Sequence, residues 1–366
     1  MNKYSKSVQI WIWIGIVMVF FQIVIGGITR LTGSGLSITK WEIVTGTLPP
    51  LSEKQWEEAF DLYRDTPQYQ QINKGMSMAE FKFIYFWEYV HRVWARLMFF
   101  VFLLPFIYFL WRKKLDKILI KKLLAVVGLA AVVASIGWIM VASGLQDRPW
   151  VNAYKLSIHL LLGLTLFTYL AWVGYGVMGL RKLHFSFSLR PWYVFLVLLV
   201  LQIFLGGMMS GTKAALFYPT WPDMHGEMIP SEILKAENWT SDNFTYYDES
   251  LFMSAFVQFF HRILAYVLLV VGLIISYRYY KRYNDPILRN AILIFSGILL
   301  SQVVVGIVTV VKSWGEIPVF WGVLHQAIAS ILLLSLFFII YLGCHRTDSV
   351  KGGNTDQKQS RQLGKR

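Results

Sequence analysis

The chain has 366 residues, of which 56% are hydrophobic and only 15% are charged. A soluble domain of this length could not bury so much apolar surface, so the composition excludes a soluble enzyme and indicates an integral membrane protein. The formal net charge of +14 would suit a nucleic-acid partner, but its distribution along the chain favours anionic lipid headgroups instead, and no nucleic-acid partner is expected.

Eight apolar runs are long enough to cross a bilayer, which takes roughly 20 residues in a helix. They lack the alternating polarity of barrel strands, so the predicted fold class is an all-α integral membrane protein with eight transmembrane helices. In chain order the runs lie at about 8–29, 84–110, 123–144, 156–179, 193–210, 251–277, 287–311 and 319–343.

The connecting segments alternate in charge. The N-terminal segment, every second loop and the C-terminal tail together hold 20 Lys/Arg and four Asp/Glu, with "WRKKLDKILIKK" (111–122) as the clearest example. This pattern is typical of cytoplasmic segments, so both termini are expected in the cytoplasm. The first helix has no small-residue cleavage site and no Arg- and Ser-rich segment before it, which favours a multi-pass protein of a bacterial plasma membrane.

The two halves of the chain resemble each other. "FQIVIGGITR" (21–30) matches "LQIFLGGMMS" (201–210), and the next matches keep the same offset of 180 residues. These pair Trp41, Gly46 and Pro50 with Trp221, Gly226 and Pro230. The repeat predicts two tandem four-helix bundles related by a pseudo-twofold axis along the membrane normal.

The repeat also divides the chain into domains. We expect an N-terminal bundle over residues 1–180, a C-terminal bundle over 181–345 and a disordered cytoplasmic tail over 346–366. The long loops 30–83 and 211–250 should lie outside. In the first of them, "SEKQWEEAFDLYRD" predicts a short helix with Ser52 as its N-cap and Gln55 completing a capping box.

Four of the seven histidines fall inside predicted spans. His184, His225 and His345 lie in loops or at an end; the four inside spans are His91, His159, His261 and His325, and the repeat aligns the first with the third and the second with the fourth. An ionisable side chain inside a membrane usually faces a partner. A single such histidine is best explained as a buried imidazole bonded to a carbonyl, but four at matched depth favour a shared role.

Pairs of histidines suit a haem. His91 and His159 lie on spans of the same direction and can face each other, as can His261 and His325. Two facing imidazoles fit the axial positions of a haem iron, whereas zinc normally needs three or four ligands. Each histidine is followed one turn later by a small residue against which a flat macrocycle could lie, although helix packing also selects such residues. These residues are Ala95, Gly163, Ala265 and Ala329.

Arginines lie near the same depth. Arg92 and Arg262 each follow the first histidine of a pair, and Arg30 and Arg96 lie close by. Guanidinium groups bind carboxylates such as haem propionates, but they also snorkel to lipid headgroups. The sequence leaves this choice open, most of all for Arg30 and Arg96.

The repeat breaks at one position, because Glu88 of the first half corresponds to Gln258 of the second. A duplicated electron carrier would have little reason to differ here, so the first bundle is predicted to hold a reaction site and the second a cofactor site. A carboxylate beside a haem edge can take part in proton transfer. The alternative is a helical ion pair of Glu88 with Arg92.

Five segments together resemble the haem A synthase family over nearly the whole membrane part of the chain. They are "GGITRLTGSGLSITKW" (26–41), "EYVHR" (88–92), "SIHL" (157–160), "FFHR" (259–262) and "LHQ" (324–326). The only cysteine is Cys344, so the chain looks like the cysteine-free branch with alphaproteobacterial and mitochondrial members.

The resemblance implies an oxidoreductase that converts a ring methyl of haem O to a formyl group by successive hydroxylations, giving haem A for terminal oxidases. It implies Glu88, His91 and His159 as catalytic residues, with the two histidines as axial ligands of the substrate iron. It also implies haem b as cofactor, with His261 and His325 as its axial ligands.

Arg92 and Arg262 are predicted as further cofactor contacts. A haem O synthase, an electron donor and a second copy of the chain are candidate partners. Because two histidine ligands leave no open position on iron, water and dioxygen both stay open as the oxygen source. The main rival interpretation is a bis-histidine diheme membrane electron carrier, and a transporter is the second.

Overall fold

The computed structural model describes residues 3–39, 48–145, 148–183, 185 and 187–344. Across these residues the fold is helical, with a single isolated β-bridge between Met224 and Glu227, and it contains the eight predicted membrane-spanning helices. They are α1 (Lys6–Leu31), α4 (Met78–Trp111), α5 (Lys117–Ala142), α6 (Ala153–Val177), α7 (Arg190–Thr212), α11 (Phe252–Arg282), α12 (Pro286–Val311) and α13 (Val319–Gly343). The expectations for Trp41, Gly46, His184, His345 and the tail 346–366 fall outside the described residues.

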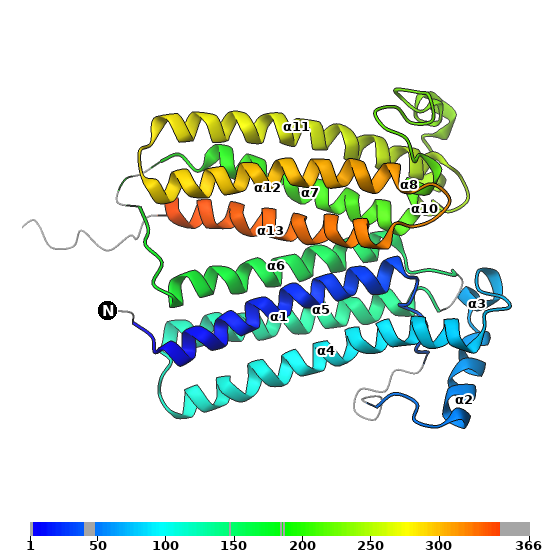
Figure 1. Ribbon diagram of the computed structural model, residues 1–366, viewed down its shortest axis with the longest axis horizontal. Helices are drawn as coiled ribbons and strands as arrows, with labels where there is room; N and C mark the ends of the chain where they lie inside the picture. The colour runs from blue at the N-terminus through cyan, green and yellow to red at the C-terminus, as the bar shows by residue number, and fades with distance from the viewer. Residues whose placement is uncertain (1–2, 40–47, 146–147, 184, 186, 345–366) are drawn as a thin grey trace, which may run out of the picture.

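The eight long helices lie side by side, and the short helices gather at one end of them (Figure 1). The short ones are α2 (Glu53–Arg64), α3 (Pro67–Gln71), α8 (Ala214–Phe217), α9 (Ser231–Leu234), the 3₁₀ helix η2 (Ala236–Asn238) and α10 (Ser241–Thr245). At the opposite end Tyr4 donates to Asp116 at 2.9 Å and the backbone N–H of Leu183 donates to Leu342 at 3.1 Å. Both ends of the described chain therefore lie on one side of the bundle, called the terminal side below, and the short helices lie on the other, the loop side.

Caps decide where several helices begin. The capping box of Ser52 and Gln55 is present at the start of α2, as predicted. A second capping box, between Ser77 and Glu80, starts α4 at Met78, whereas its apolar run begins at about 84. The hydropathy signal missed this extra part because two charged residues, Glu80 and Lys82, interrupt the apolar run in the first turns of α4.

The long helices form two groups in Figure 1, α1, α4, α5 and α6 below and α7, α11, α12 and α13 above. Helices α1 and α6 of the first group pack against α13 and α7 of the second. Small residues allow this close approach: Gly211 lies against Ala153, and a Cβ at Gly207 would lie 2.5 Å from the hydroxyl of Ser157.

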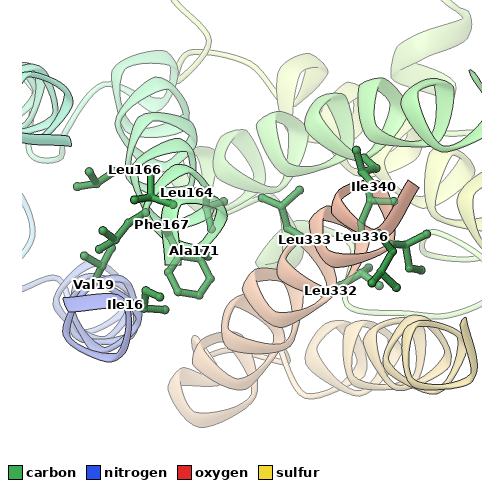
Figure 2. Packing of buried hydrophobic residues seen from close by; sticks show 14 of the residues in the cluster. Ile16, Val19, Leu164, Leu166, Phe167, Ala171, Leu332, Leu333, Leu336 and Ile340 are labelled. Carbon is green, nitrogen blue, oxygen red and sulfur yellow. The ribbon is translucent and has the colours of Figure 1, made fainter. Parts of the chain in front are cut away.

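A shared apolar core holds the helices together. Ile16 and Val19 of α1 face Leu164 and Phe167 of α6, while the buried side of α13 presents Leu332 and its neighbours (Figure 2). These contacts fix the central helices and so position the polar residues that lie nearer the loop side.

Candidate functional site

All seven residues predicted for the site line one cavity of about 890 Å³ that is shared by both groups of helices. They are Glu88, His91, Arg92, His159, His261, Arg262 and His325. The four small residues one turn after the histidines, Ala95, Gly163, Ala265 and Ala329, line the same cavity. The structure thus brings the predicted residues together.

Each histidine lies against a glycine of a neighbouring helix. A Cβ at Gly26 would lie 3.1 Å from Cε1 of His91, and a Cβ at Gly206 would lie 3.2 Å from Cε1 of His261. The second histidine of each half shows the same arrangement with less room. A Cβ at Gly137 would lie 2.7 Å from Cε1 of His159, and a Cβ at Gly306 would lie 2.8 Å from Cε1 of His325. A side chain at any of these glycines would press on the imidazole, so the glycines set the place of the rings.

The rings of His261 and His325 are spaced as two axial ligands would be. Their centroids lie 6.4 Å apart and their planes differ by 68°. Two metal–nitrogen bonds of about 2 Å each, plus about 1 Å from each nitrogen to its ring centre, give about 6 Å in total. This pair therefore fits a metal ion held between the imidazoles.

The hydrogen bond of His261 supports the same interpretation. Its Nδ1 lies 3.1 Å from the carbonyl oxygen of Gln202, which can only accept, so Nδ1 carries the proton. The other nitrogen, Nε2, then has a lone pair available for a metal. Ligand histidines are commonly held by a backbone carbonyl in this way.

Three glutamines accompany the histidines. Gln22, Gln202 and Gln302 each lie four residues before a glycine that contacts a histidine. The amide nitrogen of Gln22 lies 3.3 Å from both ring nitrogens of His91, and that of Gln302 lies 3.2 Å from both of His325. The repeat matched Gln22 with Gln202 but missed Gln302, for which the recurring pattern Q-x-x-x-G was the available signal.

Glu88 is buried, with 3% of its surface exposed, and it has three donors. Its carboxylate accepts from the hydroxyl of Ser37 at 2.7 Å, from the backbone N–H of Ile38 at 2.8 Å and from Arg92 at 2.5 Å. The ion pair with Arg92, proposed as an alternative to catalysis, is thus present. Glu88 also ties the first loop of the loop side to α4.

Gln258 also binds the loop of its half, but as a hydrogen-bond donor where Glu88 is an acceptor. Its amide donates to the carbonyl of Tyr218 at 2.6 Å, and Tyr218 corresponds to Ile38 at the offset of 180. One half therefore uses a carboxylate that accepts from the loop, and the other uses an amide that donates to it. The exchange is consistent with loop anchoring as well as with a catalytic difference.

The two matched arginines also anchor loops of the loop side. Arg262 donates to the carbonyls of Thr220, Pro222 and Asp223 at 2.6 to 3.0 Å. Arg92 donates to the carbonyl of Ile38 at 3.1 Å in addition to its ion pair. Because both side chains also line the cavity, a contact with propionates stays a prediction.

Basic groups gather where the two halves meet on the loop side. Arg30 of α1 donates to the carbonyl of Ser210 at 2.6 Å, so it crosses to α7. Lys213, just beyond α7, lies over the ring of Trp150 at 4.2 Å. Burial lowers the pKa of Lys213 and the charge of Arg30 lowers it further, while Asp248 opposes both. Both cations line the cavity, which gives its loop-side end, called the mouth below, a positive potential.

Taken together, these features define a polytopic membrane protein with four partly buried histidines in one cavity, of which His261 and His325 are spaced to hold a metal ion between them. The model of the COX15-CtaA family of cytochrome oxidase assembly proteins matches residues 9–337. The chain belongs to this family.

Curated relatives support the assignment over almost the full length. The chain is 39% identical over 349 residues to the "Heme A synthase" of Flavobacterium psychrophilum, covering 93% of this chain and 98% of the relative. It is 36% identical over 335 residues to the protein of the same name from Brucella anthropi, covering 91% and 90%. The corresponding protein of Wolbachia pipientis is 37% identical over 353 residues, covering 94% and 95%.

Proposed function

We propose that this protein is a haem A synthase, an oxidoreductase that oxidises a ring methyl of haem O to the formyl of haem A. The observation that carries the proposal is the pair of matched histidine sites in one cavity, in a chain similar to heme A synthases over more than 90% of its length. The methyl becomes a hydroxymethyl and then a gem-diol, each by a two-electron oxidation that adds one oxygen atom. With water as the oxygen source, two electrons pass to an electron-transfer partner and two protons are released; with dioxygen, the partner supplies two electrons and the second oxygen atom leaves as water. The gem-diol then loses water to give the formyl group.

We assign the substrate to the N-terminal half, residues 1–180, and the cofactor to the C-terminal half, residues 181–345. His91 and His159 would hold the iron of haem O. Glu88 lines the cavity on the same face of α4 as His91, where its carboxylate can accept a proton released during oxidation. Its bonds to Ser37 and Ile38 keep it in place and shielded from bulk water.

His261 and His325 would hold haem b, which supplies electron transfer when bound. The carbonyl of Gln202 fixes the tautomer of His261, and Gly206 and Gly306 fix the planes of the rings. Arg92 and Arg262, with Arg30 and Arg96 nearby, would offset the charge of the propionates at the cavity mouth.

We place the protein in a bacterial plasma membrane with both termini in the cytoplasm, because the loops of the terminal side are rich in Lys/Arg. The haem sites then lie toward the outer surface. A haem O synthase would supply the substrate, an electron-transfer partner would exchange electrons with haem b, and a homo-oligomer is a further candidate assembly.

Purified protein supplied with haem O, followed by extraction and mass analysis of its haems, tests the proposal. Wild type should yield haem A, whereas Glu88→Gln should accumulate haem O or a hydroxylated intermediate. Glu57→Gln, which makes the same substitution at an exposed glutamate of α2 that does not line the cavity, is the control and should still yield haem A.

A bis-histidine diheme electron carrier is the alternative, favoured by the equivalent His–Gly contacts in both halves. It predicts two resident haems that both cycle between redox states, no conversion of haem O, and full electron-transfer activity in Glu88→Gln. Either conversion by wild type or a selective defect in this variant would exclude it.

A further inference from the structure

The cavity reaches deeper toward the terminal side in the N-terminal half than in the C-terminal half. Depth is counted along each helix, from the histidine or from the glycine that contacts it, toward the terminal side; we call this starting point the His–Gly level. In the N-terminal half the cavity lining extends 11 residues beyond the His–Gly level on three helices and 12 on the fourth. The deepest lining residues there are Gly15, Leu103, Val126 and Leu170. In the C-terminal half the lining ends seven residues beyond that level on all four helices. At about 1.5 Å per residue, the first half is deeper by about 6 Å.

Four leucines close the shallower half. Leu199, Leu268, Leu299 and Leu332 lie at the same depth, one from each helix, and at most 3% of each is exposed. We call them the leucine floor. The equivalent positions in the N-terminal half hold Val19, Met98, Ala130 and Leu166, so the largest loss of volume is at Ala130, which corresponds to Leu299.

Helix packing differs at the same place. Helix α11 packs against α12, whereas the equivalent helices α4 and α5 make little contact with each other. Ala130, Ala131 and Ala134 of α5 line the cavity between them, together with Phe99 and Phe102 of α4. The N-terminal half therefore has a deep apolar extension below its histidine pair, which we call the shaft.

We propose that the shaft binds the long isoprenoid tail of haem O and that the leucine floor restricts the C-terminal site to a haem without such a tail. This inference rests on the proposed function. An apolar chain needs an apolar channel continuous with the porphyrin site, and the shaft runs away from the cationic mouth, where propionates would lie. Haem b carries no tail, so its site can end where the leucines begin.

Ala130→Leu, which copies the residue of the leucine floor into the shaft, tests the inference. Protein holding its resident haem is titrated with haem O and, separately, with haem b, and binding is followed by the absorption of the added haem. The variant should weaken binding of haem O about tenfold or more, as overfilling a cavity does. Binding of haem b to the same half, and the spectrum of the resident haem, should not change.

Ala125→Leu makes the same substitution at an exposed position of α5 that does not line the cavity, and it should behave as wild type. Equal affinity of Ala130→Leu and wild type for haem O, or equal loss of both haems, would overturn the inference. The reciprocal variant Leu299→Ala should admit haem O to the C-terminal site, which pigment extraction would detect.

The proposed function is tested separately by turnover. If wild type binds haem O more tightly than Ala130→Leu does but never oxidises it, the proposed synthase activity is contradicted and the proposed tail site is supported. If wild type yields haem A and Ala130→Leu has an unchanged KM for haem O, the synthase activity is supported and the tail site is contradicted.

Discussion

The two halves share a histidine scaffold and differ in what surrounds it. Both place imidazoles against glycines, and both anchor a loop of the loop side at the same position. The N-terminal half does so with a carboxylate above a deep shaft, and the C-terminal half with an amide above a closed floor. The two halves thus keep equivalent His–Gly contacts and differ in a few of the side chains around them.

Removing a ligand should have the largest effect. His261→Ala or His325→Ala should abolish the low-spin spectrum of the resident haem, because one imidazole cannot supply both axial ligands. His91→Ala and His159→Ala should keep that spectrum and lose formation of haem A. Absorption spectra of the purified variants measure this. The reverse pattern would exchange the assignment of the two halves.

Glu88→Gln replaces the carboxylate of the N-terminal half with the amide that the C-terminal half has at the equivalent position. If the carboxylate transfers protons, kcat should fall by about 10²- to 10⁴-fold with little change in KM. Ser37→Ala separates this role from loop anchoring, because it removes a donor and leaves the carboxylate. A defect in Ser37→Ala as large as that of Glu88→Gln would indicate that loop anchoring dominates.

The glycine contacts predict a graded effect. Gly306→Ala would place a Cβ 2.8 Å from His325, whereas Gly206→Ala would place one 3.2 Å from His261. Gly306→Ala should therefore cost more stability, about 1 to 3 kcal/mol, and should shift the haem spectrum more. Thermal unfolding of the haem-loaded variants gives the comparison, and an equal effect of both would contradict a steric origin.

The smallest effect is expected at the glutamines. Gln302→Leu removes the amide beside His325 and should cost about 1 kcal/mol, the usual worth of a single hydrogen bond. Val133 occupies the equivalent position in the N-terminal half, so Val133→Leu is the matched control and should be nearly neutral. Unfolding midpoints in denaturant would show the difference. Haem binding should survive in both variants.

Much of the candidate site was predictable because its residues are polar or ionisable and stand within otherwise apolar runs. A histidine or a glutamate inside an apolar run is visible without any structure, and the repeat makes His91 and His261 evidence for each other. The helix count was equally accessible, since the length of an apolar run reflects the thickness of the bilayer. Gln302 and the partner glycines were harder to find, because glutamine and glycine also occur in ordinary helix packing.

The sequence by itself determined the eight spans, the internal repeat and the candidate residues that the structure brings together in one cavity. Only the tertiary structure decided that Glu88 holds Ser37 and Ile38, that Gln258 holds Tyr218, and that four distant leucines form one floor. The physical reason is that hydropathy and periodicity act along one helix, whereas a loop anchor or a cavity depends on how separate helices pack against each other.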